Sequence, residues 1–414
     1  MTSIDISHCR ELDHRDDLAP LRDEFVLPEG VTYLVGNSLG PMPRAVPERM
    51  QEVVTREWAQ GLVGSWNDAG WFDQPLTLGD RLAPLVDAGP GQVVVCDTTS
   101  LNLFKVVGAA LQLRPERRTI VAEAYGFPTD VYMLESMATW TGQHRLALIE
   151  QGGAQLDDLL DQGEVAAVVL NHVDYRTGDL LDMAAVTEKV HAAGALAIWD
   201  LCHSAGALEI DLPGCDVDFA IGCTYKYLNA GPGSPAYLYV APRLQADAVQ
   251  PLSGWHGHAA PFAFTTSYEP AAGISRFRTS SPSILSFPPL AASLDLFASV
   301  DMAAVRRKSQ AMTDLFIALV DQELGDAVEV ASPRDADRRG SQVALRHPHG
   351  YQVMRALIER GVQGDFRAPD LMRFGFTPLY LRYEDVWTCV ATVREVLETE
   401  AWRSQPEPSV TAAT

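Results

Sequence analysis

The chain has 414 residues, of which 47% are hydrophobic, and its formal net charge is −22. This length predicts two or three domains, or one large domain with a smaller appendage, and the apolar content is sufficient for a large core. The acidic balance argues against a nucleic-acid partner, because phosphate backbones require clustered lysine and arginine. The six cysteines form no CxxC pair, the N-terminus is polar, and no apolar run reaches the ~18 residues of a membrane-spanning helix. We therefore expect a cytoplasmic protein with reduced thiols and no membrane contact.

The first predicted elements are a polar N-terminal arm over residues 1–30, a strand over 31–35, a helix over 47–61 and a loop over 64–74. From residue 93, short apolar strands alternate with amphipathic helices. The expected strands cover 93–96, 119–123, 144–150, 165–171, 195–200, 219–223 and 236–240, and the expected helices cover 100–113, 128–139 and 183–193. This alternation is typical of an α/β protein with a mostly parallel sheet covered on both faces.

The pattern changes near residue 290. Helices over 303–324, 351–360 and 383–399 and strands over 342–346 and 371–374 predict a small α+β domain. We expect residues 1–60 to join this small domain, 61–290 to form a large cofactor-binding domain, and 291–403 to form the small domain itself. Residues 404–414 are predicted to be a disordered tail.

Polar side chains gather after five of the predicted strands. They lie at residues 97–100, 127–130, 171–172, 200–203 and 224–226. In open α/β sheets, ligands bind beyond the carboxyl ends of the strands. No single strand end is specific, but their coincidence predicts one shared site.

The sequence restricts which cofactor could bind there. It contains neither a GxxxxGK[ST] segment nor a GxGxxG segment after a first strand, so no nucleotide fingerprint is present. The segment 97–100 (DTTS) directly precedes a predicted helix, whose N-terminus can hold one phosphate, although a plain helix cap is the alternative. Asp200 ends an apolar strand, where a buried carboxylate requires a cation. The pyridinium nitrogen of pyridoxal 5′-phosphate (PLP) is such a cation, and a structural ion pair is the alternative.

Lys226 lies between Tyr225 and Tyr227, directly after the strand predicted over 219–223. Lysines are mostly exposed, and desolvation at such a position favours a neutral amine that can attack a carbonyl. A lysine that extends past the aromatic rings to solvent is the alternative. In combination with Asp200 and the 97–100 segment, Lys226 is predicted to be a Schiff-base lysine for PLP.

Several longer motifs resemble one family, kynureninase, which belongs to the fold-type-I (aspartate-aminotransferase-like) PLP enzymes. They are GNSLG at 36–40, FPTD at 127–130, WDLCHSAG at 199–206, GCTYKYLNAGPG at 222–233 and GWHGH at 254–258. The resemblance runs in order from about residue 31 to 390. It implies a mostly parallel central sheet with a smaller α+β domain at the C-terminus.

The resemblance also implies the roles of individual residues toward the cofactor. Lys226 matches the lysine that carries PLP, and Asp200 matches the partner of the pyridinium nitrogen. The remaining implied cofactor contacts are Thr99, Ser100 and Tyr225 at the phosphate, Phe127 stacked on the ring, and Asp130, Asn171 and His203 nearby. Trp255 and Ser281 match positions that the second subunit supplies to the phosphate, which implies a homodimer.

On the substrate side, Arg373 matches the arginine that binds the α-carboxylate of the amino-acid substrate. The further implied substrate-binding residues are Asn37, Ser38, Trp66 and His256. No metal site is expected.

Three positions depart from the family pattern. Asn171 replaces the usual Ser or Thr, His256 replaces the usual Phe, and Ser281 replaces the usual Asn or Thr before a proline pair. The last two neighbourhoods lie near the substrate's aryl ring in the family. They favour a ring-substituted substrate, such as 3-hydroxykynurenine or a methylated form of it.

The implied reaction is hydrolysis of the Cβ–Cγ bond of L-kynurenine or a ring-substituted kynurenine, which gives an anthranilate and L-alanine. Tyr225 is the expected acid for the β-carbon, with its phenol pKa lowered by the nearby cation. A class-V aminotransferase and a cysteine desulfurase are the nearest alternatives. A desulfurase requires a mobile catalytic cysteine, and no cysteine here lies in a clear Gly/Ser-rich loop. A non-catalytic PLP-binding regulator would carry a basic DNA-binding segment, and none is visible.

Overall fold

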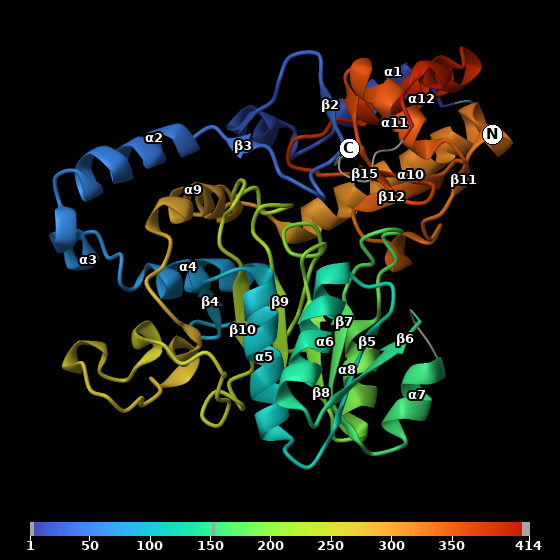
Figure 1. Ribbon diagram of the computed structural model, residues 1–414. Coiled ribbons are helices and arrows are strands. Elements are labelled where there is room, and N and C mark those ends of the chain that lie inside the picture. Colours follow the sequence, from blue (N-terminus) through green and yellow to red (C-terminus); the bar gives the residue numbers. More distant parts are fainter. Residues whose placement is uncertain (1–3, 151–153, 408–414) are drawn as a thin grey trace.

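The computed structural model describes residues 4–150 and 154–407, and a seven-stranded sheet lies at its centre (Figure 1). The strand order is β4-β10-β9-β8-β7-β5-β6. These strands are β4 (Val93–Val95), β5 (Thr119–Glu123), β6 (Arg145–Ile149), β7 (Val165–Asn171), β8 (Leu196–Asp200), β9 (Phe219–Gly222) and β10 (Tyr237–Val240). Only β10 runs against its neighbours, β4 and β9. The mostly parallel sheet predicted from the sequence is therefore confirmed.

The sheet is apolar on both faces because helices cover both. Every residue of β8 is buried, and alternate side chains enter different clusters. Trp199 packs into one apolar cluster and Ile198 into the other. The surrounding helices are α4 (Gln74–Leu82), α5 (Thr99–Leu113), α6 (Pro128–Thr141), α7 (Ala154–Leu160) and α8 (Met183–Ala192). Such cover on two faces leaves the strand ends as the place where polar side chains reach solvent.

A second, antiparallel sheet contains β11 (Glu329–Val330), β12 (Gln342–Arg346), β14 (Asp365–Arg367) and β15 (Leu371–Gly375), in the order β11-β12-β15-β14. The helices of this part are α10 (Met302–Glu323), α11 (Gly350–Glu359) and α12 (Tyr383–Glu398). N-terminal residues pack against it: α1 (Ile6–His14) contacts α12, and β2 (Thr32–Tyr33) pairs with β13 (Val362–Gln363). The helix α1 inside the N-terminal arm was not predicted.

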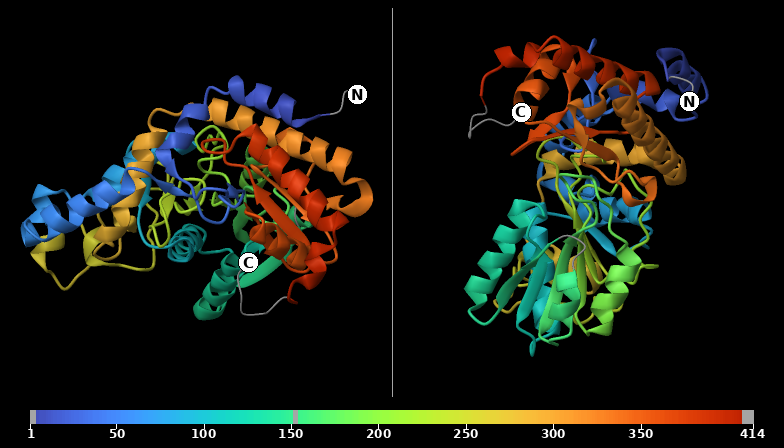
Figure 2. Two further views of the ribbon diagram at one scale, coloured as in Figure 1. Left: turned by 90° about the horizontal axis from the view of Figure 1, so that it is seen from above. Right: turned by 90° about the vertical axis from the view of Figure 1, so that its right-hand side faces the viewer.

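A third part projects sideways from the sheet, on the left of Figure 1. It contains α2 (Val46–Glu52), a π-helical continuation over Val53–Trp58, and the short α3 (Ser65–Asp68). The chain near residues 255–263 lies beside it, also in the view from above (Figure 2). We call residues 46–72 and 253–268 the projecting arm. The single helix predicted over 47–61 is thus a shorter helix with a π-helical end, and the predicted 64–74 loop contains α3.

Two further observations concern the chain as a whole. Between residues 4 and 407, omitting 151–153, no single helix is long and apolar enough to span a membrane. The helical segments Ile284–Phe297 and Met302–Glu323, which are bent relative to each other, reach the required length and apolar composition only when they are taken together. The predicted disordered tail falls largely on residues 408–414, which lie outside the described residues, and Ala401–Ser404 forms a 3-10 turn.

Candidate active site

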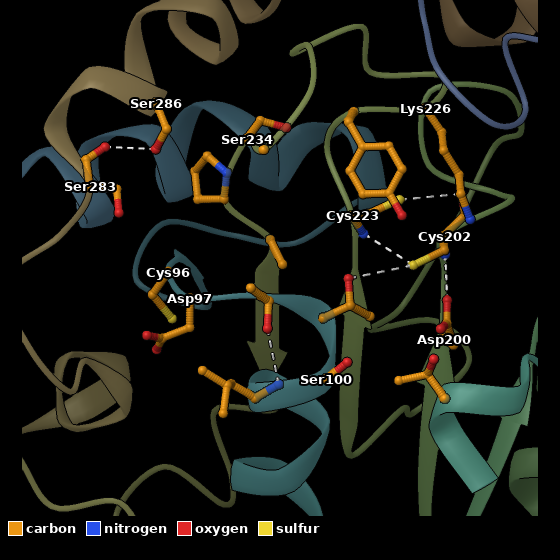
Figure 3. Close-up of a pocket in the computed structure, with 18 of the residues that line it drawn as sticks. Cys96, Asp97, Ser100, Asp200, Cys202, Cys223, Lys226, Ser234, Ser283 and Ser286 are labelled. Carbon is orange, nitrogen blue, oxygen red and sulfur yellow. Dashed lines mark hydrogen bonds between the residues drawn. The ribbon is translucent and has the colours of Figure 1, made fainter. Parts of the chain in front are cut away.

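A cavity of about 480 Å³ opens at the carboxyl ends of β7, β8 and β9 and at the N-terminus of α5 (Figure 3). Its size suits a small-molecule ligand. The structure brings together in its lining most of the residues predicted for the site: Thr99, Ser100, Phe127, Asp130, Asn171, Asp200, His203, Tyr225, Lys226, His256 and Ser281. The predicted residues outside this lining are Asn37, Ser38, Trp66, Trp255 and Arg373.

Lys226 is a buried amine with a neutral neighbour. Its Nζ lies 2.9 Å from Nε2 of His203 and 5.7 Å from the centre of the Phe127 ring. Burial, followed by the charge of Lys226, holds the pKa of His203 well below its usual range. His203 is therefore an unprotonated acceptor for the Nζ proton, and its Nδ1 has no hydrogen-bond partner among the described residues.

Asp200 ends β8 next to a second carboxyl group. Its Oδ1 accepts a hydrogen bond of 2.6 Å from the backbone N–H of Cys202. Burial, followed by the charge of Asp200, raises the pKa of Asp130 well above its usual range. Asn171, which pairs in register with Asp200, donates to Asp130 over 3.2 Å. Two buried carboxyl groups this close to each other disfavour a second negative charge at Asp130.

Asn171 also positions an aromatic ring. Its side-chain oxygen accepts a hydrogen bond of 3.1 Å from the backbone N–H of Phe127, the residue before α6. The Phe127 ring contacts Tyr175 edge-on, at 5.5 Å between centroids. Phe127 is accordingly fixed over the cavity from two sides, where it could stack on a planar ligand.

The start of α5, which we call the anion cradle, also borders the cavity. Thr98 caps the helix by accepting from the N–H of Leu101, and Thr99 and Ser100 occupy its first turn. Free N–H groups at the start of a 15-residue helix, with hydroxyls beside them, bind anions such as phosphate. Cys202 lies between this cradle and Asp200, with its Sγ 3.9 Å from Oγ1 of Thr99.

For Tyr225 the structure corrects one expectation. Burial, followed by the neighbouring Cys223 and Cys202 thiols, raises the pKa of its phenol. The predicted lowering by a nearby cation was therefore wrong: the Lys226 Nζ lies 5.8 Å from the ring centroid, and desolvation outweighs its charge. A raised pKa keeps the phenol protonated, so it remains a possible proton donor.

Arg373 lies in a buried cluster with Asn37 and Ser38, beyond the cavity wall. Only 1% of it is exposed, and its Nε donates to Asp365 over 2.7 Å. Its Nη2 donates to Ser38 over 3.0 Å and its Nη1 to the carbonyl of Tyr175, a residue that does line the cavity. Burial opposes ionisation of Asp365, but the hydrogen bonds and charge of Arg373 hold its pKa below the usual range.

His256 joins three segments of the wall. Its Nδ1 lies 3.2 Å from the carbonyl oxygen of Ser280, and its Nε2 lies 3.1 Å from Nη1 of Arg278. Nε2 also lies 2.9 Å from the carbonyl oxygen of Phe72, so it faces a donor and an acceptor at once. The same Arg278 nitrogen donates to the carbonyl of Phe72 over 3.1 Å. Burial, followed by the charge of Arg278, lowers the pKa of His256 to about 4, so both ring nitrogens serve the wall itself.

Trp66 and Trp255 lie together in the projecting arm. Their ring centroids are 6.2 Å apart, and Trp255 stacks on His256 at 5.2 Å. They therefore contact the cavity through His256 rather than line it. Ser281 lines the cavity of its own chain.

The structure adds site residues that the sequence reasoning missed. Cys202 lies inside the 199–206 motif and Arg278 lies three residues before Ser281, so proximity to those motifs could have indicated both. Asp365 had no such signal. It reaches Arg373 because β14 and β15 pair antiparallel with these two residues in register, which the sequence does not specify.

Comparison with known proteins identifies the relatives of this chain. Residues 305–393 match the family model described as the kynureninase C-terminal domain. The kynureninase of Burkholderia pseudomallei (strain K96243) is 52% identical over 408 residues, 97% of either chain. The kynureninase of Pseudomonas fluorescens is 50% identical over 399 residues, 95% of this chain and 96% of the relative.

Solved structures share the fold at low sequence identity. The cysteine desulfurase CsdA from Escherichia coli superposes with a TM-score of 0.76 at 19% identity, over 92% of this chain and 99% of that one. A cysteine desulfurase from Thermococcus onnurineus NA1 gives 0.74 at 21% identity, over 96% and 100%. These likenesses confirm the predicted fold-type-I architecture, which desulfurases share.

The two kynureninases are 52% and 50% identical to this chain, whereas the two desulfurases are only 21% and 19% identical to it. The kynureninase matches also cover at least 95% of both chains. The resemblance drawn from the motifs is thereby confirmed: the chain belongs to the kynureninase family.

Proposed function

We propose that this chain binds PLP in the cavity and hydrolyses the Cβ–Cγ bond of L-kynurenine, which yields anthranilate and L-alanine. The observation that carries the proposal is the pairing of a buried Lys226 with a neutral His203, next to Asp200, in a cavity of family-typical residues. A C-DES variant of the same fold holds glycine linked covalently to its PLP cofactor, which supports the cofactor assignment.

The residues present fit PLP at three points. The cradle of Thr99 and Ser100 suits its phosphate, and the buried Asp200 suits a protonated ring nitrogen. Lys226 is the amine that suits its aldehyde. When bound, PLP supplies an electron sink for the amino-acid carbon. Phe127 would hold the ring from one side, while Asp130 and Asn171 support Asp200 and Phe127.

Proton transfers fall to Lys226 and Tyr225. The Lys226 amine is the base that we assign to the substrate Cα proton, and His203 accepts a hydrogen bond from it over 2.9 Å. The half-buried phenol of Tyr225 stays protonated and is the acid that we assign to the β-carbon. A donor with a raised pKa retains its proton until a carbanionic carbon develops beside it.

Substrate recognition is assigned to two groups of residues: Arg373 with Asn37 and Ser38, and Trp66 with His256. Asp365 holds the Arg373 guanidinium in one orientation, and the substrate α-carboxylate would share that guanidinium. His256 directs both nitrogens to protein groups, so it offers no donor to a ring hydroxyl. For this reason we favour L-kynurenine over its 3-hydroxy and methylated derivatives, in contrast to the ring-substituted substrate expected from the sequence.

We further propose a homodimer in which Trp255 and Ser281 of each chain face the cofactor phosphate of the other. The projecting arm supports a partner of this kind, because its large apolar side chains are exposed. Val63 is 81% exposed and Phe264 is 83% exposed. Large apolar side chains this exposed on one part of a protein are typical of a surface that a partner covers.

The test is a comparison of the native chain with Lys226→Ala. The native protein is expected to absorb visible light through an imine between Lys226 and the cofactor, and borohydride should reduce this imine to a stable adduct on Lys226. It should also release anthranilate and alanine in equal amounts. Lys226→Ala should lose the trapped adduct and the turnover. A ketoacid product would indicate an aminotransferase, and sulfide release from cysteine a desulfurase. Either result, or an adduct on another lysine, would refute the proposal.

A further inference from the structure

Lys105 is a buried lysine behind the anion cradle, and the proposed reaction does not use it. It lies in α5, two turns from the helix start, and is fully buried. Its Nζ donates to the carboxylate of Asp97, to the carbonyl oxygen of Phe277 at 2.8 Å and to Oδ1 of Asn102 at 3.2 Å. An ammonium removed from water requires this many partners.

These contacts join segments that form two sides of the cavity. Asp97 follows β4, has a positive φ of 49° and lines the cavity directly before the cradle residues. Figure 3 shows Asp97 near the start of α5, which carries Ser100. Phe277 directly precedes Arg278, and the chain from there to Ser281 forms another part of the cavity wall. Lys105 therefore ties the cradle to that wall through one nitrogen.

The charge of Lys105 has a second consequence. The Asp97 side chain is 25% exposed, on the side of the cavity where the cradle would hold a phosphate. An unpaired carboxylate there would repel a phosphate dianion. Among the described residues, Lys105 is the only cation that forms an ion pair with Asp97.

We propose that Lys105 is a positioning residue for the cofactor phosphate: it neutralises Asp97 and fixes the cradle against the 277–281 wall without touching the ligand itself. This inference rests on the proposed PLP site. Loss of Lys105 should therefore weaken the binding of a ligand that carries the phosphate, and leave the binding of the pyridine ring alone unchanged.

The experiment measures how the apo-enzyme binds PLP and pyridoxal, which lacks the phosphate, by titrated absorbance. In Lys105→Met, the Kd for PLP should rise about tenfold or more, while the Kd for pyridoxal stays within about twofold. Adding Asp97→Asn to Lys105→Met removes the unpaired carboxylate and should restore most of the PLP affinity.

The chain offers a matched control. Lys308 is also buried, pairs with Asp16 at 2.6 Å and donates to the carbonyl of Pro378 at 2.6 Å, but neither of these partners lines the cavity, whereas Asp97 does. Lys308→Met should lower the apo-enzyme Tm as Lys105→Met does, and leave both Kd values unchanged. Should Lys105→Met fail to fold, Asp97→Asn alone is informative, because it should bind PLP at least as tightly as the native chain.

The outcomes separate this inference from the proposed function. Equal weakening of PLP and pyridoxal, no weakening of PLP, or no rescue by Asp97→Asn would each overturn the role of Lys105. Weaker PLP binding by Asp97→Asn alone would overturn it as well. If the native chain itself bound no PLP, the proposed function would fail instead.

Discussion

At the scale of single residues, His256 is expected to stabilise the cavity wall in a pH-dependent way. Its pKa of about 4 in the folded chain lies below the ordinary histidine value near 6.5, so the unfolded chain binds more protons between these two pH values. The free energy of unfolding therefore rises with pH across this window. In His256→Phe, this part of the pH dependence should disappear.

The measurement is the apo-enzyme Tm at about pH 5 and pH 7.5. His256→Phe should lower Tm by roughly 2–4 °C at the higher pH, because Ser280 and Arg278 each lose a hydrogen-bond partner. The deficit should shrink at the lower pH. His258→Phe, in the same loop but outside the cavity, is the control. A deficit that is equal at both pH values would show that His256 is not held neutral.

Residue types at strand ends were predictable, whereas their pairings were not. Asp200 and Lys226 stood out because a buried charge after an apolar strand is costly, and both line the cavity. Arg373 was predicted to bind the substrate, but it lies outside the cavity lining, and its pairing with Asp365 depends on strand register. The direction of the Tyr225 pKa depends on how deeply the phenol is buried, and no local pattern encodes that depth.

At the scale of elements, the turn at 36–40 is expected to hold the loop that carries Lys226. The N–H of Gly40 donates to the carbonyl of Tyr225 over 2.8 Å. A Cβ added at Gly40 would clash with the carbonyl of Lys226 and would lie 2.8 Å from Cα of Asn229. Gly40→Ala should therefore shift the Lys226 loop and lower kcat/KM by roughly 100-fold, a typical cost of misplacing a reacting group by about 1 Å.

The control for this prediction is Gly89→Ala, where an added Cβ would meet only the side chain of Gln92. It should leave kcat/KM near the native value. Absorbance of the bound cofactor reports separately whether Gly40→Ala still forms the Lys226 adduct. Native kinetics in Gly40→Ala would mean that the two segments do not depend on each other.

Elements with a local hydrophobic period were predicted well, and elements shaped by distant contacts were not. The strands β5 and β7 agree with their predicted ranges to the residue, because their apolar runs are short and sharply bounded. The helix α9 (Phe287–Phe297) was not predicted, because two prolines lie in its first turn and its apolar residues cover most of its sides. Such a segment lacks the apolar period of 3.6 residues that indicates a helix. The helix α1 buries only Cys9 and is held by packing on α12, so its own sequence carries little signal.

At the scale of the whole molecule, the projecting arm is the surface where a second copy is expected to bind. In this proposal Trp255 from the arm and Ser281 from the 277–281 wall reach the neighbouring cofactor, so assembly and cofactor affinity are linked. The native chain should have twice its 45.2 kDa mass in solution. Val63→Asp combined with Phe264→Asp places two charges on the arm and should shift the protein toward the monomer.

Light scattering after size exclusion measures the mass, and titrated absorbance measures the PLP affinity of the same samples. Because each phosphate would lose its contacts from the other chain, the double variant should bind PLP more weakly as protein is diluted, whereas the native dimer should not.

Trp140→Asp is the matched control: Trp140 is 70% exposed, but it lies on α6, away from the arm. It should leave mass and affinity unchanged. A native chain that is monomeric and fully active at all concentrations would contradict the shared site, and would leave Ser281 acting in the cavity of its own chain, which it already lines.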